Sequence, residues 1–197
     1  PLNAQRHRAV LDVLLAAGAA SVIDLGCGQG QFLRLLLEKP RFARIGGADV
    51  SASALATAER RLRLDRMGDR QRERLSLFQG SVTYEDDRFA GYDAAVLMEV
   101  IEHIDPSRLA ALARVVFGVA RPGTVVVTTP NVEYNQLYAG LTGARHADHR
   151  FEWTRAEFAA WAERVAAAYG YTVEVSGIGD PDEVLGQPTQ LGVFRHG

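Results

Sequence analysis

The 197-residue sequence has one cysteine, one lysine and no long apolar run. The single cysteine, Cys27, excludes an internal disulfide bond and makes an intracellular, cytoplasmic setting our expectation. No apolar stretch reaches the roughly 18 residues that span a membrane, and no signal peptide is visible, so we expect no membrane partner. A net charge of −2 provides no excess of positive charge for a long nucleic-acid footprint. Binding to only the end of a strand remains compatible with that charge.

The length and composition predict one globular domain over residues 1–197. The chain starts at Pro1 instead of methionine, so we expect it to be a domain of a longer protein. Apolar runs typical of strands alternate with helical patterns, which predicts an α/β doubly wound sheet. The expected strands are 21–25, 44–49, 75–79, 93–98, 123–129, 171–175 and 191–194. The expected helices are 3–17, the segment from Gly30 to about Glu38, 54–74, a helix from 105 and 154–170. No crossover helix separates the last two strands, so they should pair antiparallel.

A glycine turn follows the first strand, in the sequence VIDLGCGQG. Its three alternating glycines are Gly26, Gly28 and Gly30. A dinucleotide-binding turn needs its third glycine at position 31 or 33, where Gln31 and Leu33 stand, so that fingerprint fails. Glycine lets a ligand lie against bare backbone, which favours a cofactor turn. In this turn we interpret Cys27 as a small packing residue.

This turn resembles the first motif of class I S-adenosylmethionine-dependent methyltransferases, whose sheet has seven mostly parallel strands and an antiparallel last strand. The resemblance implies that Asp24 holds the ammonium end of the cofactor, beside the three glycines. Asp49 ends the second strand about 20 residues later, a position that suits hydrogen bonds to ribose hydroxyls. The same residue could belong to the N-cap region of the next helix, and the two roles can coexist. Ser81 follows the third strand, on the expected adenine side.

A second group of polar residues follows the fourth strand: Glu99, Glu102 and His103. If the segment is helical, this spacing places all three side chains on one face. Two facing carboxylates are costly unless a proton or a cation separates them, and a divalent metal would do so. Many small-molecule methyltransferases also have Glu-His here, as a proton acceptor or for structure. Taken alone, the motif leaves both readings open.

Residues 145–155 supply further histidines, His146 and His149, with Asp148 as a neighbour that could orient an imidazole. Either histidine could complete a four-ligand site. The combination of DLGCGQG, EVIEH and DHRFEWT resembles the small-RNA 3′-terminal 2′-O-methyltransferase family. LNAQR at the start and PTQLGVFR at the end are similar to its bacterial RNA-repair branch. The resemblance implies four metal ligands: Glu99, Glu102, His103 and His149.

The resemblance further implies metal-dependent methyl transfer from S-adenosylmethionine to the 2′-hydroxyl of an RNA 3′ end, with a kinase–ligase repair partner. Two histidines and two carboxylates suit manganese better than magnesium, although magnesium also fits. We expect Glu102 and His103 to be catalytic, with His103 taking the proton. The first alternative is a small-molecule O-methyltransferase acting on a quinone or phenol precursor. The second is a non-catalytic cofactor-binding module, which would leave the histidine–carboxylate group without a role.

Arginine is abundant, and we expect different roles for it in different segments. The arginines of 54–74 alternate with acids and predict a solvated, self-paired helix face. Arg6, near the front of the first helix, could belong to a solvated helix end or to the mouth of a substrate site, and its spacing alone favours the solvated helix end. Arg145, Arg150 and Arg155 are candidates for contacts with terminal phosphates, and Asn131 is a candidate pocket residue.

Overall fold

The computed structural model describes residues 1–138, 140–141 and 143–197, and within them a seven-stranded sheet forms the centre of the molecule. Its strands are β1 (Ser21–Leu25), β2 (Arg44–Asp49), β3 (Leu75–Gln79), β4 (Ala94–Met98), β5 (Thr124–Pro130), β6 (Tyr171–Ile178) and β7 (Thr189–His196). The strand order is β3-β2-β1-β4-β5-β7-β6. β7 runs antiparallel to both β5 and β6, while β1 to β5 pair in parallel. The predicted α/β class and the antiparallel last strand are confirmed.

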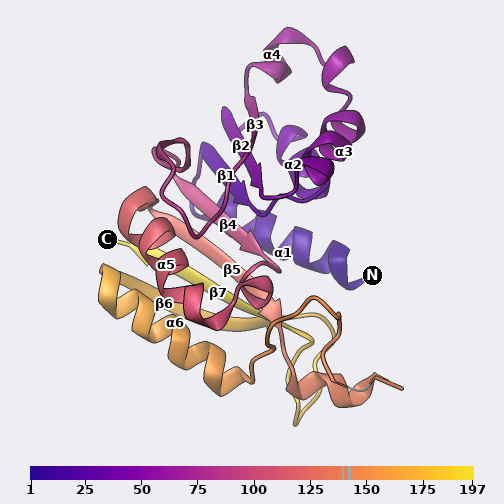
Figure 1. Cartoon of the computed structure of the whole chain (residues 1–197), viewed down its shortest axis with the longest axis vertical. Helices are drawn as coiled ribbons and strands as arrows, with labels where there is room; N and C mark the ends of the chain where they lie inside the picture. Colours follow the sequence, from indigo (N-terminus) through magenta and orange to yellow (C-terminus); the bar gives the residue numbers. More distant parts are fainter. Residues whose placement is uncertain (139, 142) are drawn as a thin grey trace.

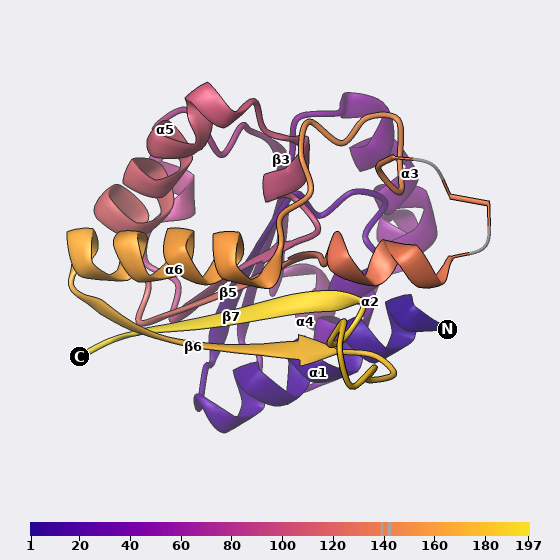
Figure 2. The same cartoon turned by 90° about the horizontal axis from the view of Figure 1, so that it is seen from below.

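Helices cover both faces of this sheet (Figures 1 and 2). They are α1 (Leu2–Ala16), α2 (Gln31–Leu37), α3 (Ala52–Leu62), α4 (Asp69–Arg72), α5 (Leu109–Ala113), which continues as a π-helix over Arg114–Ala120, and α6 (Arg155–Tyr169). The core on the α5 and α6 face contains Phe117, Phe158 and Trp161. The core on the opposite face joins α1, α2 and α3. In the part of the chain that the structure describes, no helix has the length and apolar character needed to cross a membrane.

The centre of the sheet follows directly from its sequence. β4 and β5 are buried along almost their whole length because helices cover both of their faces. Trp161 is 6% exposed within the core, as its helical spacing predicted. The loops after the parallel strands β1 to β5 leave the same end of the sheet, where ligands bind in doubly wound folds. All the predicted site residues lie in or beside these loops.

The prediction of one continuous helix over 54–74 is wrong. α3 ends at Leu62 because Arg63 takes a left-handed conformation, with φ of 53°, and a 3₁₀ turn (Leu64–Arg66) and the short α4 follow. The positions three and four residues after the buried Leu62 are Asp65 and Arg66, so the apolar face does not continue. The alternating charges of this segment are compatible with a helix, but its buried helical face ends at Leu62.

Candidate functional site

The glycine turn combines a left-handed backbone with close packing. Gly26 has φ of 87°, and a Cβ there would lie 2.5 Å from Cγ2 of Val100. Gly28 has φ of 51° and open space where a Cβ would be, so a ligand could approach its backbone. Gly30 has φ of 76° and packs against Ala58 of α3. Gly26 and Gly30 therefore allow close packing, and Gly28 allows a ligand to approach the backbone.

The N–H groups of the turn are largely used within the protein. Those of Gly26 and Cys27 donate to the carbonyl of Ala48, at 2.7 and 3.0 Å. The N–H of Gly28 donates to Oδ2 of Asp49 at 2.8 Å. Burial raises the pKa of the Cys27 thiol, which agrees with a packing role for this residue. A ligand at this turn would mainly meet bare backbone.

Two cavities flank the turn and share Gly26 and Glu99 in their walls. The first, of about 400 Å³, is lined by Asp49, Ser81 and His103 among others. The second, of about 200 Å³, is lined by Asp24, Gly28 and Arg6 among others. The predicted cofactor residues line these two neighbouring cavities, with Asp24 and Asp49 in different ones, except Gly30, which is in neither lining.

Asp24 is a buried acid at the floor of the smaller cavity. Its exposed fraction is 3%. Burial, with a smaller contribution from the negative charge of Asp49, raises the pKa of Asp24 to about 7. A cationic ligand group beside it would favour the carboxylate, as expected for the ammonium of an amino acid.

Asp49 organises the end of β2 with both of its oxygens. Oδ2 accepts from the N–H of Gly28 and Oδ1 from the N–H of Ser51, each at 2.8 Å. Ser51 itself caps α3 by accepting from the N–H of Ala54. Asp49 therefore links the glycine turn to the helix start, and its predicted ribose contact stays a prediction.

The segment Glu99–His103 is not an α-helix, so the expectation that its three polar side chains share one helical face is wrong. Glu99 has φ of 54°, its N–H donates to the carbonyl of Thr128, and only Ile101–His103 forms a 3₁₀ turn. Its carboxylate accepts from Nη1 of Arg6 at 2.5 Å and from Oγ1 of Thr128 at 2.9 Å. Glu99 thus faces Arg6 in this structure.

Three of the four predicted metal ligands come together across two loops: Glu102, His103 and His149, each with a ligand atom within 4.8 Å of the others. Glu102 is fully buried, and its Oε2 accepts from Oγ1 of Thr129 at 3.0 Å. Its Oε1 is buried with no hydrogen-bond partner. Burial, and then the charge of Glu99, raises the pKa of Glu102. A bare carboxylate oxygen beside two imidazoles fits a bound cation.

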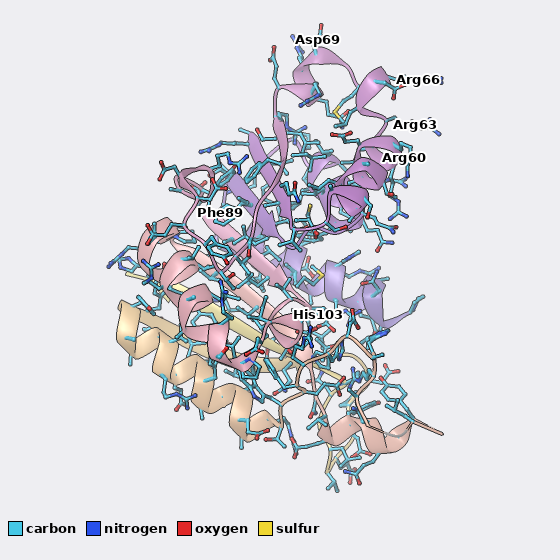
Figure 3. The ribbon with its side chains drawn as sticks, in the orientation of Figure 1. Arg60, Arg63, Arg66, Asp69, Phe89 and His103 are labelled. Atoms are coloured by element: carbon cyan, nitrogen blue, oxygen red, sulfur yellow. The ribbon has the colours of Figure 1, made fainter. Side chains whose placement is uncertain are left out.

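Each histidine of this group has a carboxylate at its Nδ1. In His103 the distance from Nδ1 to Oδ2 of Asp148 is 3.3 Å, and in His149 the distance from Nδ1 to Oε1 of Glu152 is 2.5 Å. This arrangement leaves Nε2 of each ring for a ligand or substrate. Figure 3 shows His103 beyond the ends of the central strands. Between the two candidate histidines the structure favours His149, since His146 is exposed.

Glu152 is a site residue for which the sequence suggested no role. It accepts from Nδ2 of Asn135 at 2.6 Å and from the N–H of Arg145 at 2.7 Å, in addition to His149. Burial alone would raise the pKa of Glu152, but the hydrogen bonds from Arg145, His149 and Asn135 lower it overall. The residue lies inside the DHRFEWT motif, which is the only sequence signal that could have found it.

Arg6 differs from its prediction as a solvated helix end. Its side chain is 17% exposed and pairs with Glu99. Arg145 donates to Asn135 and to the carbonyl of Asn131, and Arg155 pairs with Glu133, so both are held by protein groups.

The two remaining candidates differ in exposure. Arg150 is exposed, and its contact with a terminal phosphate stays a prediction. Asn131 is fully buried and ties together two loop carbonyls, those of Leu185 and Gln187, so the expectation of a pocket role is wrong.

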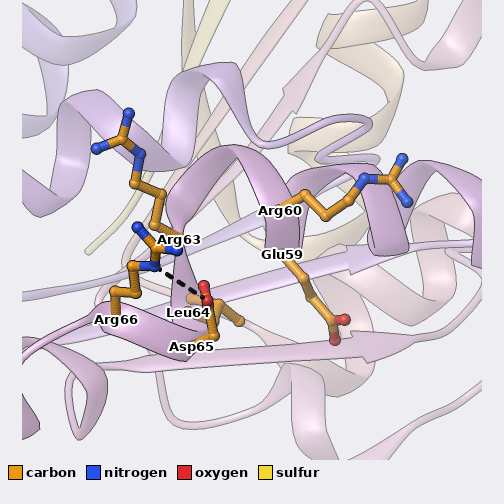
Figure 4. A pocket seen from close by; sticks show the side chains of 6 residues that line it. All are labelled: Glu59, Arg60, Arg63, Leu64, Asp65 and Arg66. Carbon is orange, nitrogen blue, oxygen red and sulfur yellow. Dashed lines mark ion pairs between the residues drawn. The ribbon is translucent and has the colours of Figure 1, made fainter.

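A larger hollow of about 560 Å³ lies on α3 and the following 3₁₀ turn, far from His103 (Figure 3). Figure 4 shows that its arginines do not converge: Arg60 points away from Arg63, and Arg66 pairs with Asp65 at 3.5 Å. Arg74, further along, donates to three backbone carbonyls. Among the ion pairs of the described residues, the predicted self-pairing is seen within 54–74 only between Arg66 and Asp65. The hollow has no evident ligand.

Comparisons with known proteins agree with this geometry. A family described as "Methyltransferase domain" matches residues 23–126. A rat protein named small RNA 2′-O-methyltransferase is 40% identical over 203 residues, covering 99% of this chain and 51% of the rat protein. The chain therefore spans about half the length of this curated relative.

Solved structures extend the likeness to the whole chain. The methyltransferase domain of a bacterial Hen1, CtHen1-C, superposes with a TM-score of 0.93 at 53% identity and covers 100% of both chains. A chain of a Pnkp1/Rnl/Hen1 RNA repair complex gives a TM-score of 0.72 at 23% identity, over 97% of this chain and 41% of that one, which shows the fold alone. The chain belongs to the methyltransferase-domain family and, within it, to the bacterial Hen1 methyltransferase domains, whose fold it has.

Proposed function

We propose that this domain transfers a methyl group from S-adenosylmethionine to the 2′-hydroxyl of the 3′-terminal nucleotide of RNA, with the help of a divalent metal. The observation that carries the proposal is the unpartnered, buried Oε1 of Glu102, beside His103 and His149 and next to the cofactor cavity. A stable protein rarely leaves such an oxygen without a donor or a cation.

The cofactor would occupy the two cavities around Gly26. The sulfonium of S-adenosylmethionine supplies an activated methyl group for in-line displacement by an oxygen. Asp24 would hold the ammonium end, and Asp49 and Ser81 would face the ribose and adenine. The bare backbone of Gly28 lets the methionine part pass close to the turn.

The metal would be held by Glu102, His103 and His149, and we keep Glu99 as the fourth proposed ligand. A divalent cation bound there would lower the pKa of a ribose hydroxyl and orient it. Two imidazoles in the set favour manganese over magnesium. Glu99 is held by Arg6 and Thr128 in this structure, so its ligand role requires exchange of the Arg6 contact.

The proton of the hydroxyl needs an acceptor within the site, and we propose His103 for this role. Its side chain is 37% exposed and lines the cavity of about 400 Å³, so the ring is accessible to substrate. Asp148 faces Nδ1 and favours an imidazole that accepts at Nε2. Ligation and proton acceptance need the same nitrogen, so His103 can perform only one of them at a time. Loss of transfer with unchanged manganese affinity in a His103 variant would identify proton acceptance.

Recognition of two neighbouring hydroxyls at this site would explain selection of an RNA end. Only the terminal nucleotide offers neighbouring 2′- and 3′-hydroxyls, and DNA lacks the 2′-oxygen. The name of the rat relative supports small RNA as the substrate class. A kinase–ligase repair partner stays a prediction, since the similarity to the repair complex concerns the fold.

The test is the transfer of labelled methyl from S-adenosylmethionine to a short RNA, with manganese present. Three acceptors are compared: RNA ending in 2′- and 3′-hydroxyls, the same RNA with a 2′-deoxy end, and a phenolic small molecule. Label only on the first acceptor supports the proposal. Label on the phenol alone would favour the small-molecule alternative, and tight cofactor binding without any transfer would favour a non-catalytic module.

A further inference from the structure

We propose that Tyr138, with the guanidinium of Arg145 beside it, forms a stacking platform for an unpaired base of the RNA, close to the 3′-terminal nucleotide. That RNA is the ligand rests on the proposed function. Tyr138 directly follows the 3₁₀ helix Glu133–Leu137, in the segment after β5 that extends away from the sheet (Figure 1).

Two consecutive apolar side chains are exposed at the end of this 3₁₀ helix. Leu137 is 50% exposed and Tyr138 is 37% exposed. The ring of Tyr134 lies edge-on to that of Tyr138, with their centroids 5.8 Å apart. Such a group differs from the singly scattered hydrophobic residues of an ordinary surface, and it marks a candidate contact area.

A cavity of about 430 Å³ opens beside Tyr138. Arg145 also lines it, and the guanidinium carbon of Arg145 lies 5.1 Å from the centroid of the Tyr138 ring. Gly140, in the same lining, has φ of 77° and open space where a Cβ would be. Aromatic rings and arginine guanidinium groups are the planar side chains on which unstacked RNA bases lie. The cavity offers both kinds of surface beside a backbone that a ligand can approach.

Hydrogen bonds connect this platform to the proposed metal group. Nε of Arg145 donates to Oδ1 of Asn135, and Nδ2 of Asn135 donates to Oε2 of Glu152, each at 2.6 Å. The backbone N–H of Arg145 donates at 2.7 Å to Oε1 of Glu152, the oxygen that also contacts His149. One carboxylate therefore positions both Arg145 and His149. A strand whose terminal ribose lies at His149 would pass Tyr138 within its last few nucleotides.

The charge beside the ring suits a strand of RNA. The acceptors that Arg145 contacts through its guanidinium are neutral, namely the amide oxygen of Asn135 and the carbonyl of Asn131. The nearby carboxylate of Glu133 is paired with Arg155. The positive charge of Arg145 is thus available to a phosphate next to the stacked base.

The competing interpretation is that Tyr138 only packs against Tyr134 and stabilises its own segment. The two interpretations differ in the RNA groups that they need, because stacking requires a base and packing within the protein does not. An abasic nucleotide keeps the ribose and the phosphate and lacks only the base. RNA with abasic positions therefore separates the two.

The experiment measures the Kd of a short, fluorescently labelled single-stranded RNA by fluorescence anisotropy, with S-adenosylhomocysteine and manganese present. An abasic nucleotide is placed in turn at each of the last few positions before the 3′-terminal one. The variants are Tyr138→Leu, which keeps an apolar side chain, and Tyr138→Phe, which keeps the ring. Tyr84→Leu is the matched control, because Tyr84 is also exposed and has Arg108 over its ring at 4.9 Å, but lies in the segment after β3.

We expect Tyr138→Leu to weaken binding of the intact RNA roughly 5- to 50-fold, the lower part of the range for a base stacked on an aromatic side chain. Tyr138→Phe and Tyr84→Leu should stay within about twofold of the wild type. One abasic position should weaken binding to the wild type by a factor similar to that of Tyr138→Leu. The same position should have little further effect in Tyr138→Leu, because that contact is already lost.

An unchanged Kd for Tyr138→Leu, or the same abasic losses in Tyr138→Leu as in the wild type, would overturn the proposal. So would a loss in Tyr138→Phe as large as that in Tyr138→Leu, or a wild type that does not bind RNA. Melting curves establish that the variants are folded. If Tyr138→Leu does not fold, Tyr138→Trp replaces it. The larger ring should increase the loss at the same abasic position, and an unchanged loss would overturn the proposal.

The outcome for this platform is separate from the outcome for methyl transfer, because the binding measurement contains no methyl donor. RNA binding that depends on Tyr138, without transfer in the labelled-methyl assay, would contradict the proposed function and support the platform. Transfer to RNA by a protein whose RNA affinity does not depend on Tyr138 would support the proposed function and overturn the platform.

Discussion

Glu152 holds His149 through a 2.5 Å contact between Oε1 and Nδ1, and the two side chains are only 2% and 3% exposed. The N–H of Arg145 and the amide of Asn135 fix the carboxylate from other directions. The imidazole therefore cannot turn freely, and its Nε2 is presented to Glu102 and His103. This preorganised contact links the loop after β5 to the proposed metal site.

Replacing Glu152 tests whether this contact serves metal binding. We expect Glu152→Gln to weaken manganese binding roughly 10- to 100-fold, because the neutral amide orients the imidazole less well and lowers its basicity. Binding of S-adenosylhomocysteine should be unchanged, since Glu152 is not among the residues described as lining its cavities. Calorimetric titration with manganese measures the effect, and Glu163→Gln on the exposed face of α6 is the control. Unaltered manganese affinity would contradict this role.

We expect the Glu102 side chain to lower the free energy of unfolding when no metal is bound. Its pKa is raised well above the unfolded value, so the carboxylate form is disfavoured in the fold and the metal-free protein loses stability as the pH rises towards that pKa. In chelator at about pH 8, we expect Glu102→Gln to raise Tm by on the order of 3 °C, since about 1 kcal/mol corresponds to 2–4 °C in a domain of this size.

The same variant should lose the stabilisation that manganese gives to the wild type. Differential scanning calorimetry with and without manganese measures both effects. A lower Tm of Glu102→Gln in chelator, together with an intact manganese-dependent increase, would show that Glu102 is a structural acid and not a ligand.

Asp24 should make cofactor binding depend on pH. With a pKa of about 7 in the free protein, Asp24 is largely protonated below that pH. An ammonium group favours the carboxylate, so binding should release a proton, and affinity should fall by up to about tenfold per pH unit below 7. Titration of S-adenosylhomocysteine in buffers of different ionisation enthalpy counts the proton.

The variant Asp24→Asn should bind weakly at every pH and release no proton at this position. Asp12→Asn, at an exposed position of α1, should behave like the wild type. A wild-type affinity that stays constant between about pH 6 and pH 8 would contradict the assignment of Asp24 to the ammonium.

The glycines of the turn should differ in what they tolerate. Gly28→Ala should cost only roughly 1–2 kcal/mol of stability, because the left-handed backbone is strained but the space is open. Its methyl group should nevertheless weaken cofactor binding. Gly26→Ala should cost roughly 3 kcal/mol or more, because its Cβ would lie 2.5 Å from Cγ2 of Val100.

Chemical denaturation of both variants measures the difference. Adding Val100→Ala to Gly26→Ala should restore part of the lost stability, since it removes the atoms that collide. Equal stability of the two single variants would mean that the packing against Val100 does not constrain the turn.

The fold was predictable where local patterns and burial agree. β4 is apolar throughout and β5 has an apolar run at its centre, because both strands lie in the middle of the sheet. The segment 54–74 shows the opposite case. Its alternating charges are compatible with a helix on the surface, but the left-handed Arg63 ends the helix where the buried face stops. Surface charge alone does not reveal such a break.

The site was predictable where a motif carries it and not where distant contacts do. Asp24, Glu102 and His149 lie in recognisable motifs, and the structure places them around one region. The pairing of Arg6 with Glu99 joins positions 93 residues apart, and no periodicity reports such a contact. Residue spacing also could not predict the left-handed backbone at Glu99. There the carboxylate faces Arg6 and not the group of metal ligands.

The most direct test of the account measures methyl transfer to RNA ending in 2′- and 3′-hydroxyls, starting from chelator-treated protein and adding manganese stepwise. The wild type should be inactive in chelator and regain activity as the site fills, while His149→Ala should stay inactive although it binds S-adenosylhomocysteine normally. His103→Ala should lose transfer, and its manganese affinity shows whether ligation or proton acceptance is its main role. Full transfer by the wild type in chelator, or by His149→Ala, would contradict metal-dependent catalysis at this site.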